Sequence, residues 1–184
     1  MSRTALPGIE LREFTDGDLA FLARVYAASR HDEMAMIPDW SQAQKDHFLQ
    51  WQFQAQHHHY LKYYPDASYR LIIKEGEEIG RLYIARMNNE IRLMDIALLT
   101  AYRGHGIGSG LVRELMAEAD RSRKYISLHV EAQNPAKRLY QRLGFTVVGE
   151  VGVYQLMHWI PEGLTPIYPP GWQTGSDNQV NTAS

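Results

Sequence analysis

One stretch of this sequence limits the possible folds more than any other, and it runs from Leu98 to Asp120. An apolar strand pattern leads into it and a glycine-rich turn follows. The turn reads Arg103-Gly104-His105-Gly106-Ile107-Gly108-Ser109-Gly110. After the turn, apolar residues recur every three or four positions from Leu111 to Ala119, which is typical of a helix with one buried face. The stretch therefore predicts a strand, a tight turn and an amphipathic helix.

Such a turn can hold an anion. The first amides of a helix have no partner inside the helix, and the helix dipole places partial positive charge there. Glycines at 104, 106, 108 and 110 let a ligand approach the backbone closely. A diphosphate is the usual ligand of such a site. A turn without any ligand is the alternative, because many strand-to-helix turns contain glycine.

Other phosphate-binding motifs fit the turn less well. A nucleoside-triphosphate loop would end in Lys followed by Ser or Thr, and no such pair closes this turn. A dinucleotide-binding turn should open the first strand–helix–strand unit, whereas this turn lies late in the chain.

Composition narrows the class of protein. The chain has 184 residues, 45% hydrophobic and 22% charged, with a formal net charge of −2 and no cysteine. This length predicts one domain with one core, and the charge gives no domain-wide basic footprint for nucleic acid. Without cysteine, disulfides, thiolate nucleophiles and thiolate metal sites are excluded. No signal-peptide pattern or membrane-length apolar run is visible, so we expect a soluble, cytoplasmic protein without a membrane or nucleic-acid partner.

Hydrophobic periodicity and turn residues predict the remaining elements. The expected strands are 9–14, 69–74, 79–86, 90–99, 125–131, 145–148 and 153–160. The other expected helices are one with Leu19, Phe21, Leu22, Val25 and Tyr26 on one face, and those at 41–63 and 134–143. Ser41 is expected to cap the long helix, whose apolar side is assigned to Phe48, Trp51, Gln52 and Ala55. Residues 29–39 are expected to form a loop. Gly144 is expected to end the last helix.

Two further segments have an unusual composition, the histidine triplet at residues 57–59 and the C-terminal residues 163–184. Consecutive helical residues do not face each other, so His57-His58-His59 is expected to be a solvated polar stretch rather than a metal site. Residues 163–184 are rich in Pro and Gly and then polar, which predicts a tail after a single domain of residues 1–162. We expect that tail to lie on the surface as far as about Trp172.

A second motif spans Val130 to Phe145 and reads VEAQNPAKRLYQRLGF. Together with the Arg103-x-x-Gly106-x-Gly108 spacing after a strand, it resembles the GNAT superfamily of N-acyltransferases over nearly the whole chain. The resemblance implies an α/β (α+β) fold with a mixed, mostly antiparallel sheet of six to seven strands and about four helices. Its fourth and fifth strands would splay apart. Thr100 and Ala101 stand where that family often has proline and an acidic residue.

The resemblance also implies acetyl-CoA as co-substrate, without a metal. By match, the strand end at Ile96, Leu98 and Thr100 would pair with the pantetheine arm, and an amide near Leu98 would polarise the thioester carbonyl. Asn134 would hydrogen-bond the same arm. The pyrophosphate would be bound by Arg103, Gly104, His105, Gly106, Ile107, Gly108 and Ser109.

For catalysis, Tyr140 matches the tyrosine that the family uses as general acid toward the departing thiolate, and it would also contact the coenzyme. An attacking amine must lose a proton, and His129 falls where related enzymes carry a basic glutamate. Glu131 and Asp95 are alternatives for this base. For each of these side chains a purely structural role is the competing interpretation.

The acceptor is expected to be a small-molecule or peptide amine. The resemblance implies an acceptor pocket built from the first two helices, their loop and the last strand pair, which here gives Asp32, Glu33, Asp39, Trp40, Tyr154 and Trp159. Carboxylates beside aromatic rings would suit a cationic amine. The alternative is that these residues are solvated loop and core. The sequence thus predicts an N-acetyltransferase that works by direct transfer in a ternary complex, with homodimerisation a further expectation. A non-catalytic module that senses acyl-CoA or an amine, and a nucleotide-binding domain of another fold, are the alternatives.

Overall fold

The computed structural model describes residues 1–170, and the chain forms two compact units. The first unit contains residues 1–85 and 95–110, and the second contains residues 86–94 and the chain from 111 onward. Three elements contribute to both units: strand β5 (Glu90–Leu98), helix α4 (Ile107–Ser122) and strand β4 (Glu77–Arg86), through its last residue.

The first unit is built on an antiparallel sheet. Its strands are β1 (Ser2–Arg3), β2 (Ile9–Glu13), β3 (Ser68–Lys74) and β4 (Glu77–Arg86), and each pairs with the next. Gly80 on β4 lies close to the end of β5, since a Cβ there would be 2.3 Å from the carbonyl oxygen of Ala97. Real Cβ atoms do not approach an oxygen so closely, so only glycine fits at this position.

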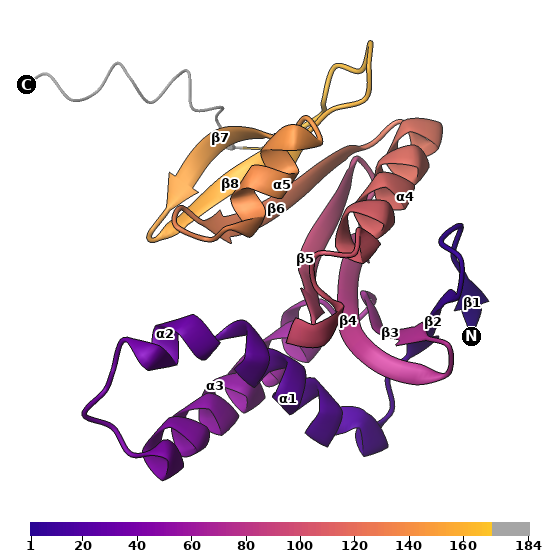
Figure 1. Cartoon of the computed structure of the whole chain (residues 1–184). Helices are drawn as coiled ribbons and strands as arrows, with labels where there is room; N and C mark the ends of the chain where they lie inside the picture. The colour runs from indigo at the N-terminus through magenta and orange to yellow at the C-terminus, as the bar shows by residue number, and fades with distance from the viewer. Residues whose placement is uncertain (171–184) are drawn as a thin grey trace, which may run out of the picture. The chain divides into compact units, whose positions relative to one another are not determined.

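Helices of the first unit are α1 (Leu19–Ser29), α2 (His31–Ala35) and α3 (Gln42–Tyr63), and α1 crosses α3 and packs against it (Figure 1). The predicted cap of α3 is confirmed, because Ser41 Oγ accepts a hydrogen bond of 3.2 Å from the Gln44 amide. The prediction of a loop over residues 29–39 was wrong for α2. This single short helix carries one buried apolar side chain, Met34, which is too weak a pattern to identify from sequence.

The inward face of α3 also differs from the prediction. Its buried side chains are Leu49 and Phe53, whereas Trp51 is 61% exposed. His57 lies on this inward face, between the rings of Phe14 and Phe53 at centroid distances of 5.3 and 5.7 Å. Burial lowers the pKa of His57, so this first histidine of the triplet packs as a neutral ring and is not part of a solvated stretch.

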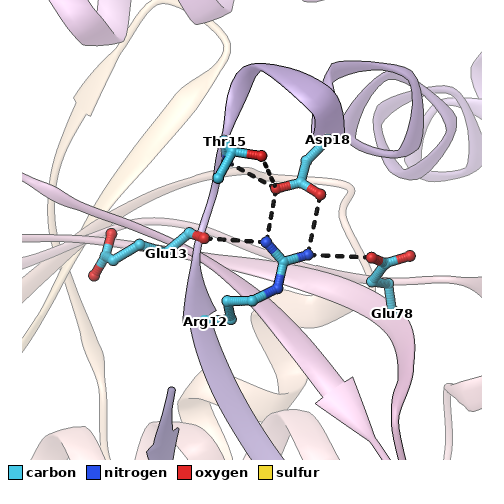
Figure 2. A network of polar contacts seen from close by, with 5 residues as sticks. All are labelled: Arg12, Glu13, Thr15, Asp18 and Glu78. Carbon is cyan, nitrogen blue, oxygen red and sulfur yellow. Dashed lines mark hydrogen bonds and ion pairs between the residues drawn. The ribbon is translucent and has the colours of Figure 1, made fainter.

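An ion-pair network fixes the start of α1 to the sheet (Figure 2). The Arg12 guanidinium donates to both carboxylate oxygens of Asp18 at 2.9 and 3.0 Å, and to Glu78 at 3.1 Å. Asp18 also accepts from the Thr15 amide at 2.7 Å. These hydrogen bonds, with that from Arg12 the largest cause, lower the pKa of Asp18 to about 2. The network joins β2, the turn before α1 and β4.

The second unit contains the first part of β5 together with β6 (Tyr125–Glu131), β7 (Thr146–Val151) and β8 (Tyr154–Trp159). Residues 90–92 of β5 pair in parallel with residues 125–127 of β6, and β6 and β7 each pair antiparallel with β8. Helices α4 and α5 (Ala136–Arg142) belong here as well. Along α4, Leu111, Val112, Leu115 and Ala119 are buried, as the predicted periodicity requires. The chain leaves α5 at Gly144 with φ +98°, which confirms the predicted glycine stop.

The fold class is confirmed as a mixed α/β architecture. Residues 1–170 contain eight strands, and the additional one is the two-residue β1. The predicted splay of the two central strands and the single domain of residues 1–162 stay predictions. Beyond residue 160, Tyr168 stacks on His158 with ring centroids 5.7 Å apart, while Trp172 lies outside the described residues. None of the described helices combines the length and the apolar character that crossing a bilayer requires.

Candidate functional site

The glycine-rich turn joins β5 to α4 in the first unit. A 3-10 turn at Thr100–Tyr102 ends the strand segment, and Gly104 and Gly106 follow with φ +77° and +79°. The Gly110 amide donates to the Gly106 carbonyl at 3.0 Å, so Gly106 is the residue at which the helical hydrogen bonds begin. The amides of residues 107–109 therefore precede the first helical bond and are available to a ligand. These features confirm the predicted turn geometry.

Space above the turn is open at three of its four glycines. A Cβ built on Gly104, Gly106 or Gly108 would meet no atom within 4 Å. Gly110 differs, because a Cβ there would lie 2.5 Å from Leu6 Cδ2. The expectation that all four glycines serve ligand approach was therefore wrong for Gly110, which provides room for packing of the N-terminal segment.

Side chains around the turn hold it in place. Arg103 Nε donates to the carbonyl oxygen of Leu98 at 3.0 Å, and the Leu99 amide donates to Ile79 on β4 at 2.8 Å. The Tyr102 hydroxyl donates to Glu77 at 2.9 Å. This bond to the carboxylate raises the pKa of Tyr102. The strand end and the turn are thus tied to β4, while Arg103 and His105 remain exposed.

Asp95, one of the candidate bases, forms an ion pair with a buried arginine. Its carboxylate pairs with Arg81, whose side chain is 2% exposed and also donates to Gln56 at 3.0 Å. The Arg81 guanidinium lies 4.9 Å from the centroid of the Tyr83 ring. Burial is the largest effect and opposes the charge of Arg81, but the Asp95 carboxylate together with Tyr83 and Tyr60 outweighs it, so the pKa of Arg81 is raised. The structural interpretation of Asp95 is therefore the better one.

The predicted coenzyme residues Asn134 and Tyr140 lie in the second unit. Asn134 lies just before α5, and Tyr140 lies within this helix. Asn134 Oδ1 accepts from the Ala136 amide at 2.9 Å and so caps this helix, while the exposed side chain keeps an amide nitrogen as donor. Tyr140 is 7% exposed, with its ring 5.7 Å from that of Phe145. The sequence motif therefore also has a structural role, because Asn134 caps the start of α5 and Phe145 packs against Tyr140.

The candidate bases His129 and Glu131 lie on β6 with Ser127, at alternate positions that share one face. His129 is exposed and Ser127 is fully buried. Partial loss of solvent around its ring is the largest cause that lowers the pKa of His129, the positive charge of Arg92 adds to it, and Glu90 acts in the opposite direction. Lowering the pKa keeps the imidazole neutral near pH 7, which is the state that accepts a proton.

The charges next to His129 belong to a buried network that the sequence did not reveal. Glu90 accepts from Arg92 at 3.0 Å, from Tyr125 at 3.1 Å and from Ser127. Arg92 Nε also donates to Ser127 Oγ at 3.2 Å. Charged residues at alternate positions, such as Glu90 and Arg92, are typical of the solvent-facing side of a strand. Only the parallel pairing of β5 with β6 places them next to Ser127.

Comparisons with known proteins agree with these motifs. Residues 65–147 match the model of a family described as an acetyltransferase (GNAT) domain. A mycothiol acetyltransferase of Corynebacterium glutamicum strain R is 40% identical over 90 residues, which are 46% of this chain and 30% of that protein. A Bacillus subtilis protein, named as a candidate ribosomal protein bS18-alanine N-acetyltransferase, is 35% identical over 91 residues, or 47% of this chain and 59% of that protein. The match thus spans less than two thirds of these curated relatives.

The central part of this chain is similar to the GNAT family. A solved structure of the same fold is the PaiA N-acetyltransferase of Thermoplasma acidophilum in complex with coenzyme A. It aligns with a TM-score of 0.64 and 20% identity, covering 83% of this chain and 98% of that one. The glycine turn and the Asn134 motif both lie within the GNAT match.

The predicted acceptor residues of this chain are distributed over both units. In the first, Glu33 pairs with Arg30 at 2.8 Å, and Trp40 lines a surface hollow of about 620 Å³ together with Phe48 and Trp51. Asp32 and Asp39 are exposed in the same unit. In the second unit, Trp159 contacts the backbone near Gly144 and Tyr154 lines a different cavity with Glu131. The structure thus brings Glu131 and Tyr154 together.

Metal ligation gives no further candidate within the described part of the chain. Among residues 1–170, no three His, Asp or Glu side chains are placed to hold one ion. The expectation of metal-free chemistry stays a prediction, as do the cytoplasmic location and the lack of nucleic-acid and membrane partners.

Proposed function

We propose that this chain is an acetyl-CoA-dependent N-acetyltransferase that transfers the acetyl group directly to a primary amine. The observation that supports this most is the open turn at Gly104, Gly106 and Gly108, which precedes the unpaired amides of α4. Main-chain donors and partial positive charge at one helix end suit a diphosphate. The GNAT relatives and the coenzyme A complex of the structural neighbour support the coenzyme.

In this proposal the main chain binds most of the coenzyme. Backbone groups at Ile96, Leu98 and Thr100 would pair with the pantetheine arm, and the Leu98 amide would stabilise negative charge on the thioester oxygen. Residues 103–109 would bind the pyrophosphate, with Arg103 adding charge. Asn134 would contribute its amide nitrogen, since its oxygen already caps α5.

The proposed chemistry needs one proton acceptor and one proton donor. His129, held neutral, would take a proton from the ammonium form of the acceptor, directly or through water, with Glu131 as the alternative base. The amine then attacks the thioester carbon. As the tetrahedral adduct collapses, the carbon–sulfur bond breaks and Tyr140 would donate a proton to the departing thiolate. The new amide nitrogen would lose its second proton to solvent, and Tyr140 would be reprotonated from solvent. No acyl-enzyme is formed in this scheme.

Assembly and domain organisation are part of the same proposal. Residues 1–162 would act as one catalytic domain, and the acceptor would be a small molecule or a peptide. A homodimer is the assembly that we expect, and sedimentation equilibrium of the full chain measures it.

An amine panel with detection of released coenzyme A thiol tests the proposed function. We expect acetyl-CoA-dependent thiol release with at least one amine, and Tyr140→Phe should lower kcat more than it weakens coenzyme A binding. Tight coenzyme A binding without transfer to any amine would instead support the sensor alternative. Equal loss of turnover and affinity in Tyr140→Phe would assign this residue to binding alone.

A further inference from the structure

Arg92 on β5 is a near neighbour of the proposed base in the sheet of the second unit. Residues 90–92 of β5 pair in parallel with residues 125–127 of β6, which places Arg92 opposite Ser127. His129 is the next residue of β6 on the same face, so the Cα atoms of Arg92 and His129 are about 8 Å apart by standard strand spacing. A charge at this distance affects the protonation of an imidazole.

Hydrogen bonds hold the guanidinium of Arg92 in this place. Its Nε donates to Ser127 Oγ at 3.2 Å, and a second nitrogen donates to Glu90 Oε1 at 3.0 Å. The Ser127 hydroxyl donates to Glu90, which also accepts from Tyr125 at 3.1 Å. Glu90 and Ser127 are buried, and the Arg92 side chain is 26% exposed. The positive charge is therefore fixed, and it is screened less than a charge on the open surface.

Other ionisable groups surround His129. Glu90 carries the opposite charge, but it lies two residues further from His129 along β5 than Arg92 does. His158 on β8 is uncharged at pH 7, because burial lowers its pKa to about 4. Tyr168 stacks on His158 and is uncharged as well, because burial raises its pKa.

The other side of His129 holds one more carboxylate. Glu131 follows on the same face of β6, with Tyr154 opposite it on β8. A carboxylate favours the protonated imidazole, so Glu131 acts in the same sense as Glu90. Arg92 is thus the positive charge on this face that opposes protonation of His129.

Two histidines show that the effect of Arg92 depends on position. Loss of solvent is the largest cause that lowers the pKa of both His129 and His158, and the charge of Arg92 adds to it in both. At His129 the effect of Arg92 exceeds the opposing effect of Glu90, whereas at His158 the effect of Glu90 is the larger. The network is therefore arranged so that its positive end acts on His129.

We infer that Arg92 is a positioning residue: Glu90 and Ser127 fix its guanidinium where the charge favours the proton-accepting form of His129. The inference rests on the proposed function for the role of His129 as base. An imidazole kept neutral can take a proton from the acceptor at a lower pH than an unperturbed one. In this role Arg92 acts through His129 and not on the acceptor.

NMR titration of the full chain without acetyl-CoA or acceptor tests the inference independently of catalysis. The ring signals of isotope-labelled histidines are followed over the range in which imidazole titrates, and His129→Gln identifies the signal of His129. Arg92→Gln should raise the pKa of His129 by about 0.5 to 1, and Glu90→Gln should lower it by about 0.3 to 0.5. A general loss of structure would not move the pKa in opposite directions.

Two further variants serve as controls. Arg92→Lys keeps the positive charge and should leave the pKa of His129 within about 0.3 of the parent value. Arg121→Gln removes the same charge from an exposed position at the end of α4 and should leave this pKa unchanged. Circular dichroism confirms that each variant is folded. If Arg92→Gln does not fold, Glu90→Gln and Arg92→Lys still test the sign of the effect.

The outcomes separate the inference from the proposed function. Shifts of opposite sign in Arg92→Gln and Glu90→Gln support the inference, and the acid limb of the kcat/KM profile should then move by the same amounts. If the pKa shifts while the acid limb stays in place, Arg92 controls His129 but the proposed base is contradicted. Unchanged pKa values, or shifts of one sign in both variants, overturn the inference. In that case thiol release with an amine would still support the proposed transferase.

Discussion

Gly108 and Gly110 lie two positions apart in α4, and the structure assigns them opposite roles that one pair of variants can separate. A Cβ on Gly108 would enter open space, whereas a Cβ on Gly110 would lie 2.5 Å from Leu6 Cδ2 and 2.8 Å from Leu6 Cδ1. Neither position has a positive φ. Alanine therefore meets no backbone strain at either site, and the surroundings of the new methyl group decide the outcome.

Gly108→Ala should make the protein more stable and a poorer binder of coenzyme A. Alanine is favoured over glycine in helices by up to about 1 kcal/mol, and in the first turn we expect about 0.5 kcal/mol. For a chain of this size, this gain raises Tm by about 1–2 °C. The methyl group would occupy space that the diphosphate needs and would cost one charge-assisted hydrogen bond, so coenzyme A affinity should fall about 10- to 100-fold.

Gly110→Ala should do the reverse. The added methyl displaces Leu6, and overpacking of this kind costs about 1–3 kcal/mol. Because Leu6 is only partly buried and can rotate, we expect a value near the lower limit, about 1 kcal/mol, with Tm lowered by about 2–4 °C. Coenzyme A affinity should stay within about twofold of the parent. Adding Leu6→Ala to Gly110→Ala should remove the clash and recover most of the lost stability.

Differential scanning calorimetry and coenzyme A titration of the same four proteins give both quantities. The reasoning is refuted if Gly108→Ala leaves coenzyme A affinity unchanged, because the open space above the turn would then not be where the diphosphate binds. It is also refuted if Gly110→Ala is as stable as the parent, since the contact with Leu6 would then not require glycine.

Two further predictions concern buried charges. Asp95→Asn leaves the Arg81 guanidinium buried without its counter-ion, so urea unfolding should show a loss of about 3–5 kcal/mol, and Arg81→Met in the same background should restore part of it. An unchanged midpoint would contradict the buried pair. Burial lowers the pKa of His158 to about 4, with Glu90 opposing this and Arg92 and His129 adding to it. Because the unfolded chain binds the proton with a pKa of about 6.5, stability should fall by about 3 kcal/mol as the pH drops from 6.5 to 4. His158→Gln should flatten that slope, and a parent whose stability is level over this range would show that the ring is not buried neutral.

Local patterns anticipated most elements of the fold. The strand–turn–helix at residues 98–120, the Ser41 cap and the Gly144 stop depend on residues within one or two turns of each other, and such short-range preferences are readable from sequence. The inward face of α3 was not readable in this way. Phe48 and Trp51 are as apolar as Leu49 and Phe53, and only the packing of α3 with α1 and the sheet selects the second pair.

The candidate site was likewise only partly predictable from local sequence patterns. The sequence by itself determined the glycine turn that we propose to bind an anion and the motif around Asn134, because glycine spacing and a helix start fix main-chain donors locally. Only the tertiary structure decided that Asp95 neutralises Arg81, that Gly110 makes room for Leu6, and that Glu90 and Arg92 lie under Ser127. The physical reason is that a charge or a methyl group acts over a few ångströms, and strand register sets which residues come within that range.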